Sequence, residues 1–380
     1  MSQLSSTKKS ILLAALVIFG SLAIITFNLQ NSQIVFVDKE DTYGVFNHPF
    51  MQTFSMFVAE FLCLLAFFYV KTTKSYKSQY EEACDNGIQR IKILLILIPT
   101  CCDSIGALCI YISLNFLPPS VNSILTCGII ATSAILSRLM LKRRYTTKEI
   151  QGCALVLVGV AIVGISGFAF PEEQKQEDIK KQIISIFLML FSIFLYGFQY
   201  TIEERFYKTY FIHPLELIGF EGMWGLIIYT FICISLTFTK CPEVLYNVCI
   251  PYDGEFYFER ADYYFQQFSQ SALLQFAVIF GILSISVYNT MCQTVTKYLS
   301  CVTRALVDVA KIMMIWIISL IISLSTSSSN YHWENVRLGA IIIEVVGFSF
   351  VVAGEIIYNF NATQVEGTDE LTENLSLQKG

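Results

Sequence analysis

The sequence predicts an all-α integral membrane protein in which ten transmembrane helices form two inverted five-helix repeats. The first observation is composition: 54% of the 380 residues are hydrophobic and 14% are charged, whereas soluble globular proteins carry about 25% charged residues. The second is a series of apolar runs, each close to the ~20 residues that a helix needs to cross ~30 Å of hydrocarbon. The third is a weak internal repeat of these runs.

The apolar runs place the ten spans, in chain order, at about 10–29, 50–70, 91–113, 120–140, 149–170, 183–202, 214–238, 271–292, 302–324 and 335–358. No water-soluble core hides ten such helices in succession, so membrane spans are favoured over buried core helices. The first run, Ile11–Ile25, has some features of a cleaved signal peptide, but its length and the lack of a small-residue cleavage site favour a span.

Two His-Pro pairs reveal the repeat, because His48-Pro49 opens the second span and His213-Pro214 opens the seventh. Proline fits the first turn of a helix, where its missing N–H would be unpaired in any case. No partner carboxylate is evident near either histidine, so we favour helix punctuation over a proton relay as their role.

Glycine-rich stretches support the same repeat: "GCALVLVGVAIVG" (152–164) in the fifth span resembles "GAIIIEVVGFSFVVAG" (339–354) in the tenth. Glycines at such spacing most simply allow close helix packing. Each unit has an odd number of spans, so the second enters the membrane from the opposite side, as in transporters with inverted repeats. We therefore expect a first repeat at 1–170, a polar linker at 171–182, a second repeat at 183–360 and a polar, disordered tail at 361–380.

Basic residues predict the orientation. An even number of spans puts both termini on one side, and that side holds twice as many Lys and Arg residues outside the spans as the other. Cytoplasmic loops carry such an excess, so both termini are expected in the cytoplasm. The two glycosylation sequons of the tail, at Asn361 and Asn374, would then stay bare.

Ionisable residues inside spans are the main functional candidates, because each costs ~2.5–3.5 kcal/mol near the bilayer centre on insertion scales. The ninth span carries Arg304, Asp308 and Lys311, whose spacings of four and three put them on one helix face. They form either a structural ion-pair ladder or the lining of a cavity, and we expect Arg304 and Asp308 to act as a pair. Asp103 is the clearest buried acid of the first half. Weaker cavity candidates are Gln199, Tyr200 and Asn289.

The sequence says less about the roles of the other acids. Glu60, Glu221 and Glu344 also fall within spans, whereas Glu203 and Glu204 fall where the sixth span is expected to end, which favours an interfacial position. The sequence has no Gly-rich phosphate loop, HExxH or CxxC motif, so we expect no enzyme activity, no cofactor and no metal site.

The loop between the seventh and eighth spans holds Cys241 and Cys249, eight residues apart. An oxidising lumen permits a disulfide between them, and two free thiols are the alternative. The rest of the loop, "FERADYYFQQFSQS", is either an amphipathic helix on the membrane surface or an ordinary connector.

Four stretches together resemble the drug/metabolite transporter superfamily, specifically the F branch of solute carrier family 35, which is similar to chloroquine-resistance-type transporters. They are "HPFMQTFSMFVAEFLC" (48–63), "LIPTCCDSIGALCIYISLNF" (97–116), "EERFYKTYFIHPLELIGFEGMWG" (203–225) and "TVTKYLSCVTRALVDVAKIMMIW" (294–316). The resemblance covers roughly residues 10–360 and implies ten helices in two inverted halves. It also makes a Cys241–Cys249 disulfide relevant, because the chloroquine-resistance-type relatives brace this loop with disulfides.

The leading hypothesis is a secondary transporter that moves a polar organic solute across an intracellular membrane by alternating access. Arg304 and Lys311 would attract an anionic group, while Asp103 and Asp308 would balance them or carry a proton. The rival is a transporter-derived scaffold subunit without transport activity. The expected partners are a small solute and the lipid bilayer, not nucleic acid; a homodimer or membrane-complex partners stay open. The resemblance favours the endomembrane system (lysosome, vesicle or Golgi), with the mitochondrial inner membrane as the alternative.

Overall fold

The computed structural model describes residues 6–37, 42–114, 125–170, 179–242, 249–252, 254–326, 333 and 337–377. Within these residues, nine helices are long and apolar enough to cross a membrane, and a tenth apolar helix is shorter. In chain order they are α1 (Ser6–Asn31), α2 (Pro49–Thr72), α4 (Leu97–Leu114, after the 3-10 turn η1, Ile93–Ile96), the shorter α6 (Gly128–Met140), α7 (Thr147–Ala169), α8 (Ile179–Thr209), α9 (Pro214–Thr237), α11 (Ala272–Tyr298), α12 (Cys301–Ser325) and α13 (Leu338–Leu377). The predicted ten-helix, all-α membrane fold is confirmed.

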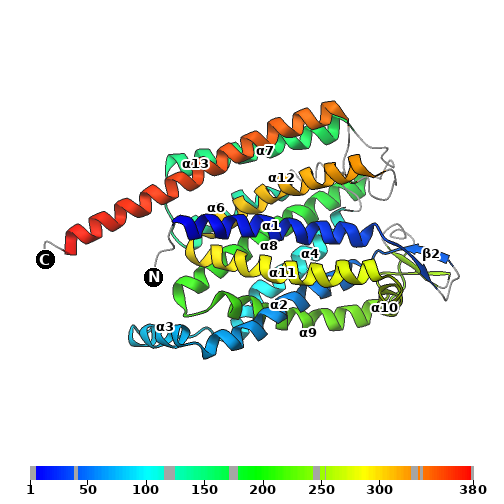
Figure 1. Cartoon of the computed structure of the whole chain (residues 1–380), viewed down its shortest axis with the longest axis horizontal. Coiled ribbons are helices and arrows are strands. Elements are labelled where there is room, and N and C mark those ends of the chain that lie inside the picture. The colour runs from blue at the N-terminus through cyan, green and yellow to red at the C-terminus, as the bar shows by residue number, and fades with distance from the viewer. Residues whose placement is uncertain are drawn as a thin grey trace.

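Smaller elements lie at the two ends of this bundle. Both chain termini and α3 (Lys74–Asp85) lie at one end, called the terminus end below (Figure 1). The opposite end carries two antiparallel hairpins, β1 (Ile34–Val37) with β2 (Thr42–Val45) and β3 (Ile250–Tyr252) with β4 (Glu255–Tyr257). The short helix α10 (Ala261–Gln270) lies beside them, so the loop predicted as either a helix or a connector contains a helix.

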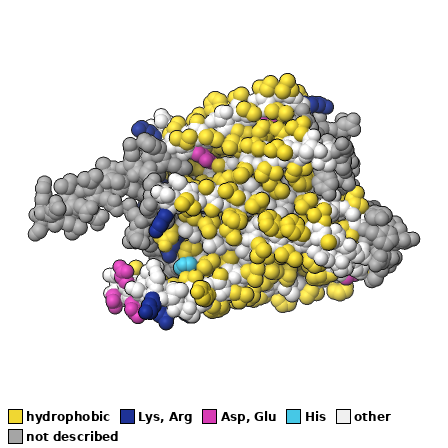
Figure 2. Space-filling view, viewed as in Figure 1, with side chains coloured by type: hydrophobic (Ala, Val, Ile, Leu, Met, Phe, Trp, Pro, Cys, Tyr) yellow, Lys and Arg dark blue, Asp and Glu magenta, His cyan; other side chains and the backbone are white. Residues whose placement is uncertain are grey.

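Apolar side chains cover the flank of the bundle between its two ends, as Figure 2 shows. Phenylalanines on the apolar helices, such as Phe68, Phe231 and Phe276, are exposed. A water-soluble protein rarely exposes so large a continuous apolar area, whereas a bilayer requires it.

The packing of the helices follows the predicted repeat. α1 packs against α11 and α12, and α8, its expected counterpart in the second half, packs against α4 and α6. α2 packs against its own counterpart α9, and α7 against its counterpart α13. A two-fold relation between the halves produces this pattern, because exchanging each helix for its counterpart reproduces the same set of neighbours.

Glycines bring α7 and α13 into backbone contact. A Cβ atom added at Gly159 would lie 2.6 Å from the carbonyl oxygen of Gly347, and one added at Gly152 would lie 2.8 Å from that of Gly354. Real Cβ atoms do not approach oxygen so closely, so the two helices can cross at this distance only where the side chain is a hydrogen atom. The close-packing role predicted for these glycines is confirmed.

The two His-Pro pairs begin α2 and α9, as predicted, but the side chains of the two histidines make different contacts. His213 caps α9: its Nδ1 accepts a hydrogen bond from the Leu215 N–H at 3.2 Å, and Glu216 completes the cap and pairs with Arg90. His48 makes no such cap. The expectation that neither histidine has a carboxylate partner is wrong, because His48 Nδ1 lies 2.6 Å from Glu259 Oε1.

Two helix ends differ from expectation. α8 continues to Thr209, well past the expected end of the sixth span, so Glu203 and Glu204 lie inside the helix. α13 continues to Leu377, so residues 361–377 of the expected disordered tail are helical. Residues 120–124 of the fourth span and 171–178 of the polar linker lie outside the described residues.

Candidate functional site

The candidate site is a group of buried charges between the first three turns of α12 and the helices that surround it. α12 begins at Cys301, where the Ser300 hydroxyl accepts a hydrogen bond from Thr303 N–H at 3.0 Å and Glu204 accepts one from Cys301 N–H at 2.8 Å. These caps satisfy N–H groups that a helix start leaves free, and an acid at this position also complements the helix dipole. They fix the register from which Arg304, Asp308 and Lys311 project.

Arg304 pairs with Glu203 of α8, not with Asp308. Its Nη1 lies 2.6 Å from Glu203 Oε2, and the two side chains are 8% and 0% exposed. The guanidinium also lies 3.9 Å from the centre of the Tyr200 ring, one helical turn from Glu203 on α8, in a cation–π contact. The predicted Arg304–Asp308 pair is therefore wrong: a partner on a neighbouring helix holds the guanidinium.

Asp308 belongs to a second, adjacent network. It lies 3.2 Å from Lys311 Nζ and accepts hydrogen bonds from the hydroxyls of Tyr288, at 2.5 Å, and Tyr200, at 3.1 Å. The Tyr288 hydroxyl in turn accepts a hydrogen bond from Lys311 at 2.5 Å. Tyr200 thus touches both networks, its ring under Arg304 and its hydroxyl on Asp308.

Two further acids lie where α2 crosses α9. Glu60 accepts a hydrogen bond from the Asn289 amide at 2.8 Å, and Glu221 Oε1 has no hydrogen-bond partner within the described part of the chain. The neighbouring Gly222 lets the helices approach, since a Cβ atom there would lie 2.6 Å from Glu60 Cβ. Both carboxyl groups are 3% exposed or less.

Asp103 of α4 completes the group and interacts electrostatically with Glu203 and Arg304. Four acids and one base act on one another electrostatically and form what we call the acid cluster, namely Glu60, Asp103, Glu203, Glu221 and Arg304. Its formal charge is negative if every acid is ionised, and a buried charge without compensation is costly.

Several polar atoms in and near the acid cluster lack a hydrogen-bond partner among the described residues: Glu60 Oε2, Glu203 Oε1, Glu221 Oε1 and Arg304 Nε. Such atoms are rare in folded proteins, and each one needs an explanation. The described residues contain no group of His, Cys, Asp and Glu side chains suited to a metal ion. A bound solute or ordered water would account for the unpaired atoms, whereas bound protons would lower the charge of the acids without supplying an acceptor for Arg304 Nε.

The sequence candidates fall into two groups. The structure brings Asp103, Tyr200, Asn289, Arg304, Asp308 and Lys311 into these two networks. Gln199 is buried, and its Oε1 has no hydrogen-bond partner among the described residues.

Sequence reasoning missed Tyr288 and the importance of Glu60 and Glu221. An acid within an apolar run was the available signal for the last two. It placed Glu203 at the membrane interface, because the polar segment that follows this residue hid the continuation of α8 to Thr209.

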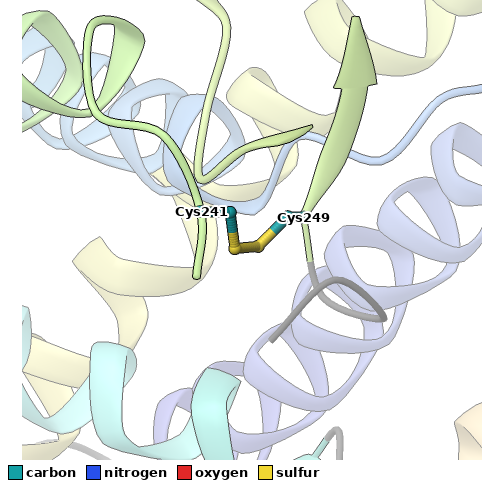
Figure 3. Close-up of a disulfide and its surroundings, with 2 residues drawn as sticks. All are labelled: Cys241 and Cys249. Carbon is teal, nitrogen blue, oxygen red and sulfur yellow. A yellow bond between two sulfur atoms is a disulfide. The ribbon is translucent and has the colours of Figure 1, made fainter. Parts of the chain in front are cut away.

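A disulfide joins Cys241 to Cys249 in the loop after α9, with a Cα–Cα distance of 6.4 Å (Figure 3). This is the pair that the sequence offered as either a disulfide or two free thiols. The bond ties the end of α9 to strand β3 at the end of the bundle opposite the termini.

Comparison with known proteins agrees with this architecture. The model of the EamA-like transporter family matches residues 42–165. "Solute carrier family 35 member F6" of Homo sapiens and that of Rattus norvegicus are each 26% identical over 314 residues, which is 83% of this chain and 78% of theirs. An uncharacterized protein of Schizosaccharomyces pombe is 24% identical over 322 residues, or 84% of this chain and 89% of that one. One crystal structure, 10% identical, aligns with 95% of this chain at a TM-score of 0.57, which shows the fold alone.

Proposed function

Because the chain belongs to the drug/metabolite transporter superfamily, in the F branch of solute carrier family 35, we propose that it is a secondary transporter of a polar organic solute. It works across an intracellular membrane by alternating access, with the two five-helix halves rocking around the acid cluster. The sequence contains no nucleotide-binding motif, so an ion or solute gradient drives the movement.

The observation that carries the proposal further is the charge of the acid cluster. Glu203 forms an ion pair with the guanidinium of Arg304, and Asp308 forms one with the ammonium of Lys311. The positive charge of each base is therefore already balanced by a carboxylate, which argues against the anion-attracting role that the sequence suggested for them. The acids are in excess, and this supports a cationic solute.

Exchange of that cation for protons follows from the same excess. A protonated Glu221 or Glu60 is neutral and tolerable in a buried site, whereas the ionised form needs a counter-charge. Release of the proton to water leaves a carboxylate that binds the cation, and rebinding of a proton on the other side expels it. The charge of the site then stays nearly constant through the cycle.

Flux in liposomes tests this function. The purified chain is reconstituted, an outward proton gradient is imposed, and uptake of tetraethylammonium is compared with that of glutamate and a nucleotide sugar. We expect uptake of the cation alone, and its loss in Glu221→Gln. Glu344→Gln is the matched control, because Glu344 is also buried but is satisfied by Ser166 and Trp316 outside the cluster.

Other outcomes are equally decisive. Uptake of an anionic solute that survives Glu221→Gln would overturn the cationic solute while leaving a transporter. Absence of flux for all solutes in a broad screen, with stoichiometric co-purification of a larger membrane complex, would favour the scaffold function instead.

We place both termini in the cytoplasm and the hairpin end in an oxidising lumen. Two independent features support this orientation: the excess of basic residues on the terminus side, and the Cys241–Cys249 disulfide at the opposite end. An endomembrane compartment satisfies both.

A further inference from the structure

The turn between α6 and α7, residues 141–146, lies at the terminus end of the bundle (Figure 1) and is rich in basic side chains. Five of the eleven residues from 138 to 148 are Lys or Arg, and none is Asp or Glu. Four of the five are exposed and make no ion pair within the described part of the chain. We call these four the basic patch: Arg138, Lys142, Arg144 and Lys148.

Arg143, the fifth base, is turned inward and holds the turn together. Its Nη2 lies 3.2 Å from Glu149 Oε1, and its guanidinium lies 5.2 Å from the centre of the Tyr145 ring. The other oxygen of Glu149 accepts hydrogen bonds from the backbone N–H and the hydroxyl of Thr146, at 2.7 Å and 3.0 Å. The acid that follows the patch in the sequence is thus balanced by Arg143 and committed to the start of α7, so it does not neutralise the patch.

Lys142 has a backbone conformation that its side chain disfavours. It directly follows Leu141, the C-cap of α6, and its φ of 54° is in the left-handed region. Glycine is the usual residue at this position, because it adopts this conformation without steric cost. The turn would form at least as well with glycine, so the fold alone does not explain a lysine here.

Exposed apolar side chains flank the basic patch on both helices. Ile135 and Leu139 lie on α6, and Ile150 lies in the first turn of α7. On the face drawn in Figure 2, Lys and Arg side chains likewise border the apolar flank at the terminus end. The patch therefore lies at the level where hydrocarbon gives way to lipid headgroups.

A second group of lysines at the same end offers a comparison. Lys71, Lys74 and Lys77, at the end of α2 and in α3, are exposed as well. A general excess of cytoplasmic bases accounts for both groups alike. Helix α3, however, also carries acids that offset its lysines, namely Glu81, Glu82 and Asp85. The basic patch has no such counter-charges nearby in the sequence.

We propose that the basic patch binds the headgroup of an anionic membrane lipid whose acyl chains lie along the apolar surfaces of α6 and α7. Lys and Arg side chains donate charge-assisted hydrogen bonds to phosphate oxygens, and several bases close to a bilayer attract anionic lipids together. The exposed Ile135, Leu139 and Ile150 favour a lipid over a soluble phosphate, because only a lipid also covers apolar surface.

The bound headgroup would connect two parts of the bundle. α6 packs against α8 and α12, whereas α7 packs mainly against α13. A lipid held from both sides of the α6–α7 turn therefore fastens the α7–α13 pair to the remaining helices at the terminus end. This inference goes beyond the proposed function and does not depend on which solute moves.

Native mass spectrometry of the purified full chain in detergent tests the patch. A phosphatidylinositol phosphate and a phosphatidylcholine with the same acyl chains are titrated, and their dissociation constants are compared. Wild type should bind the phosphoinositide at least about tenfold more tightly. The patch variant, Lys142→Gln with Arg144→Gln and Lys148→Gln, should lose most of this preference. The control variant, Lys71→Gln with Lys74→Gln and Lys77→Gln, removes the same charge at the same end and should keep it.

Lys142→Gly separates binding from folding. Glycine relieves the left-handed backbone, so the unfolding temperature without added lipid should be unchanged or higher. The preference for the phosphoinositide should nevertheless fall about fivefold, the share of one base close to a membrane surface. An unchanged preference in this variant would show that the lysine does not contact the headgroup.

Three further results would overturn the proposal. Equal affinity of wild type for the two lipids would leave the patch without a ligand. Equal losses in the patch and control variants would assign the preference to overall charge. Binding of soluble inositol bisphosphate as tightly as the phosphoinositide would replace the lipid with a free phosphate compound.

Discussion

Glu203 and Arg304 lie 2.6 Å apart between α8 and α12, almost completely shielded from solvent. Removing the base and removing the acid should not cost the same free energy of unfolding, because Glu60, Asp103 and Glu221 also interact electrostatically with the guanidinium. Loss of the one base leaves four acids uncompensated, whereas loss of one acid leaves three others near the base.

Arg304→Gln should therefore destabilise the protein more than Glu203→Gln. Removing one partner of a buried pair costs about 3–5 kcal/mol in the free energy of unfolding, and we expect the arginine variant to approach this range and the glutamate variant to fall below it. Thermal unfolding in detergent micelles at neutral pH ranks the two. Equal losses would mean that the other three acids do not contribute to the balance.

The Tyr288 hydroxyl joins Lys311 to Asp308, so Tyr288→Phe should disturb the second network without changing its shape. Loss of a buried hydrogen-bonding group costs about 1–3 kcal/mol. Tyr200→Phe removes one hydrogen bond to Asp308 and should cost less, while Tyr200→Leu also removes the ring under Arg304. Tyr200→Phe should lower the unfolding temperature least, and Tyr288→Phe and Tyr200→Leu should lower it more. A Tyr288→Phe protein as stable as wild type would contradict a stabilising role for the hydrogen bonds of the Tyr288 hydroxyl.

Stability should fall in acid because of His213. Burial and, secondarily, the charge of Lys297 lower the pKa of His213 from its ordinary 6.5 to about 4. Between these values the unfolded chain binds a proton that the folded chain does not, so stability decreases as the pH falls from 6.5 towards 4. Melting curves across this window should show a smaller acid loss for His213→Asn, which caps α9 without titrating. An unchanged acid loss would assign it to other groups.

The glycine contact between α7 and α13 predicts that no side chain larger than a hydrogen atom is tolerated at Gly159 without loss of stability. Gly159→Ala places a methyl group where a carbonyl oxygen lies 2.6 Å away, and overpacking of this kind costs about 1–3 kcal/mol. Val158→Ala, at the exposed neighbouring position, should be nearly neutral. Comparable losses for the two variants in a thermal melt would show that α7 and α13 can separate at little cost.

Glycosylation measures the orientation directly. Wild-type chain made in a eukaryotic host should carry no glycan on Asn361 or Asn374, because both lie on the predicted cytoplasmic side. His332→Thr creates a sequon at Asn330, in the loop between α12 and α13 on the opposite side, and should acquire one. Glycan on the wild-type tail would invert the topology.

Local rules predicted much of the fold. Pro49 and Pro214 marked the starts of α2 and α9 because the restriction that proline imposes acts within its own helical turn. The glycines of 152–164 predicted close packing because small residues in an apolar run have few other uses. Such signals depend only on neighbouring residues, so a single sequence contains them.

Tertiary contacts decided the rest. The four-residue spacing of Arg304 and Asp308 predicted an ion pair, yet a guanidinium reaches across to α8 as readily as along its own helix, and Glu203 offered a carboxylate there. His48 and Glu259 are likewise far apart in sequence, and their contact depends on where α10 packs. Helix periodicity carries no information on such pairs.

The distribution of cysteines makes the native chain convenient for spectroscopy. Of the free cysteines in the described residues, Cys84 on α3 is the exposed one, whereas most of the others are buried in the bundle. A maleimide dye in a buffer without reductant should therefore attach chiefly at Cys84, while the Cys241–Cys249 bond stays closed and unreactive. A single fluorophore at the terminus end could then follow movements of α3 without first replacing the other thiols.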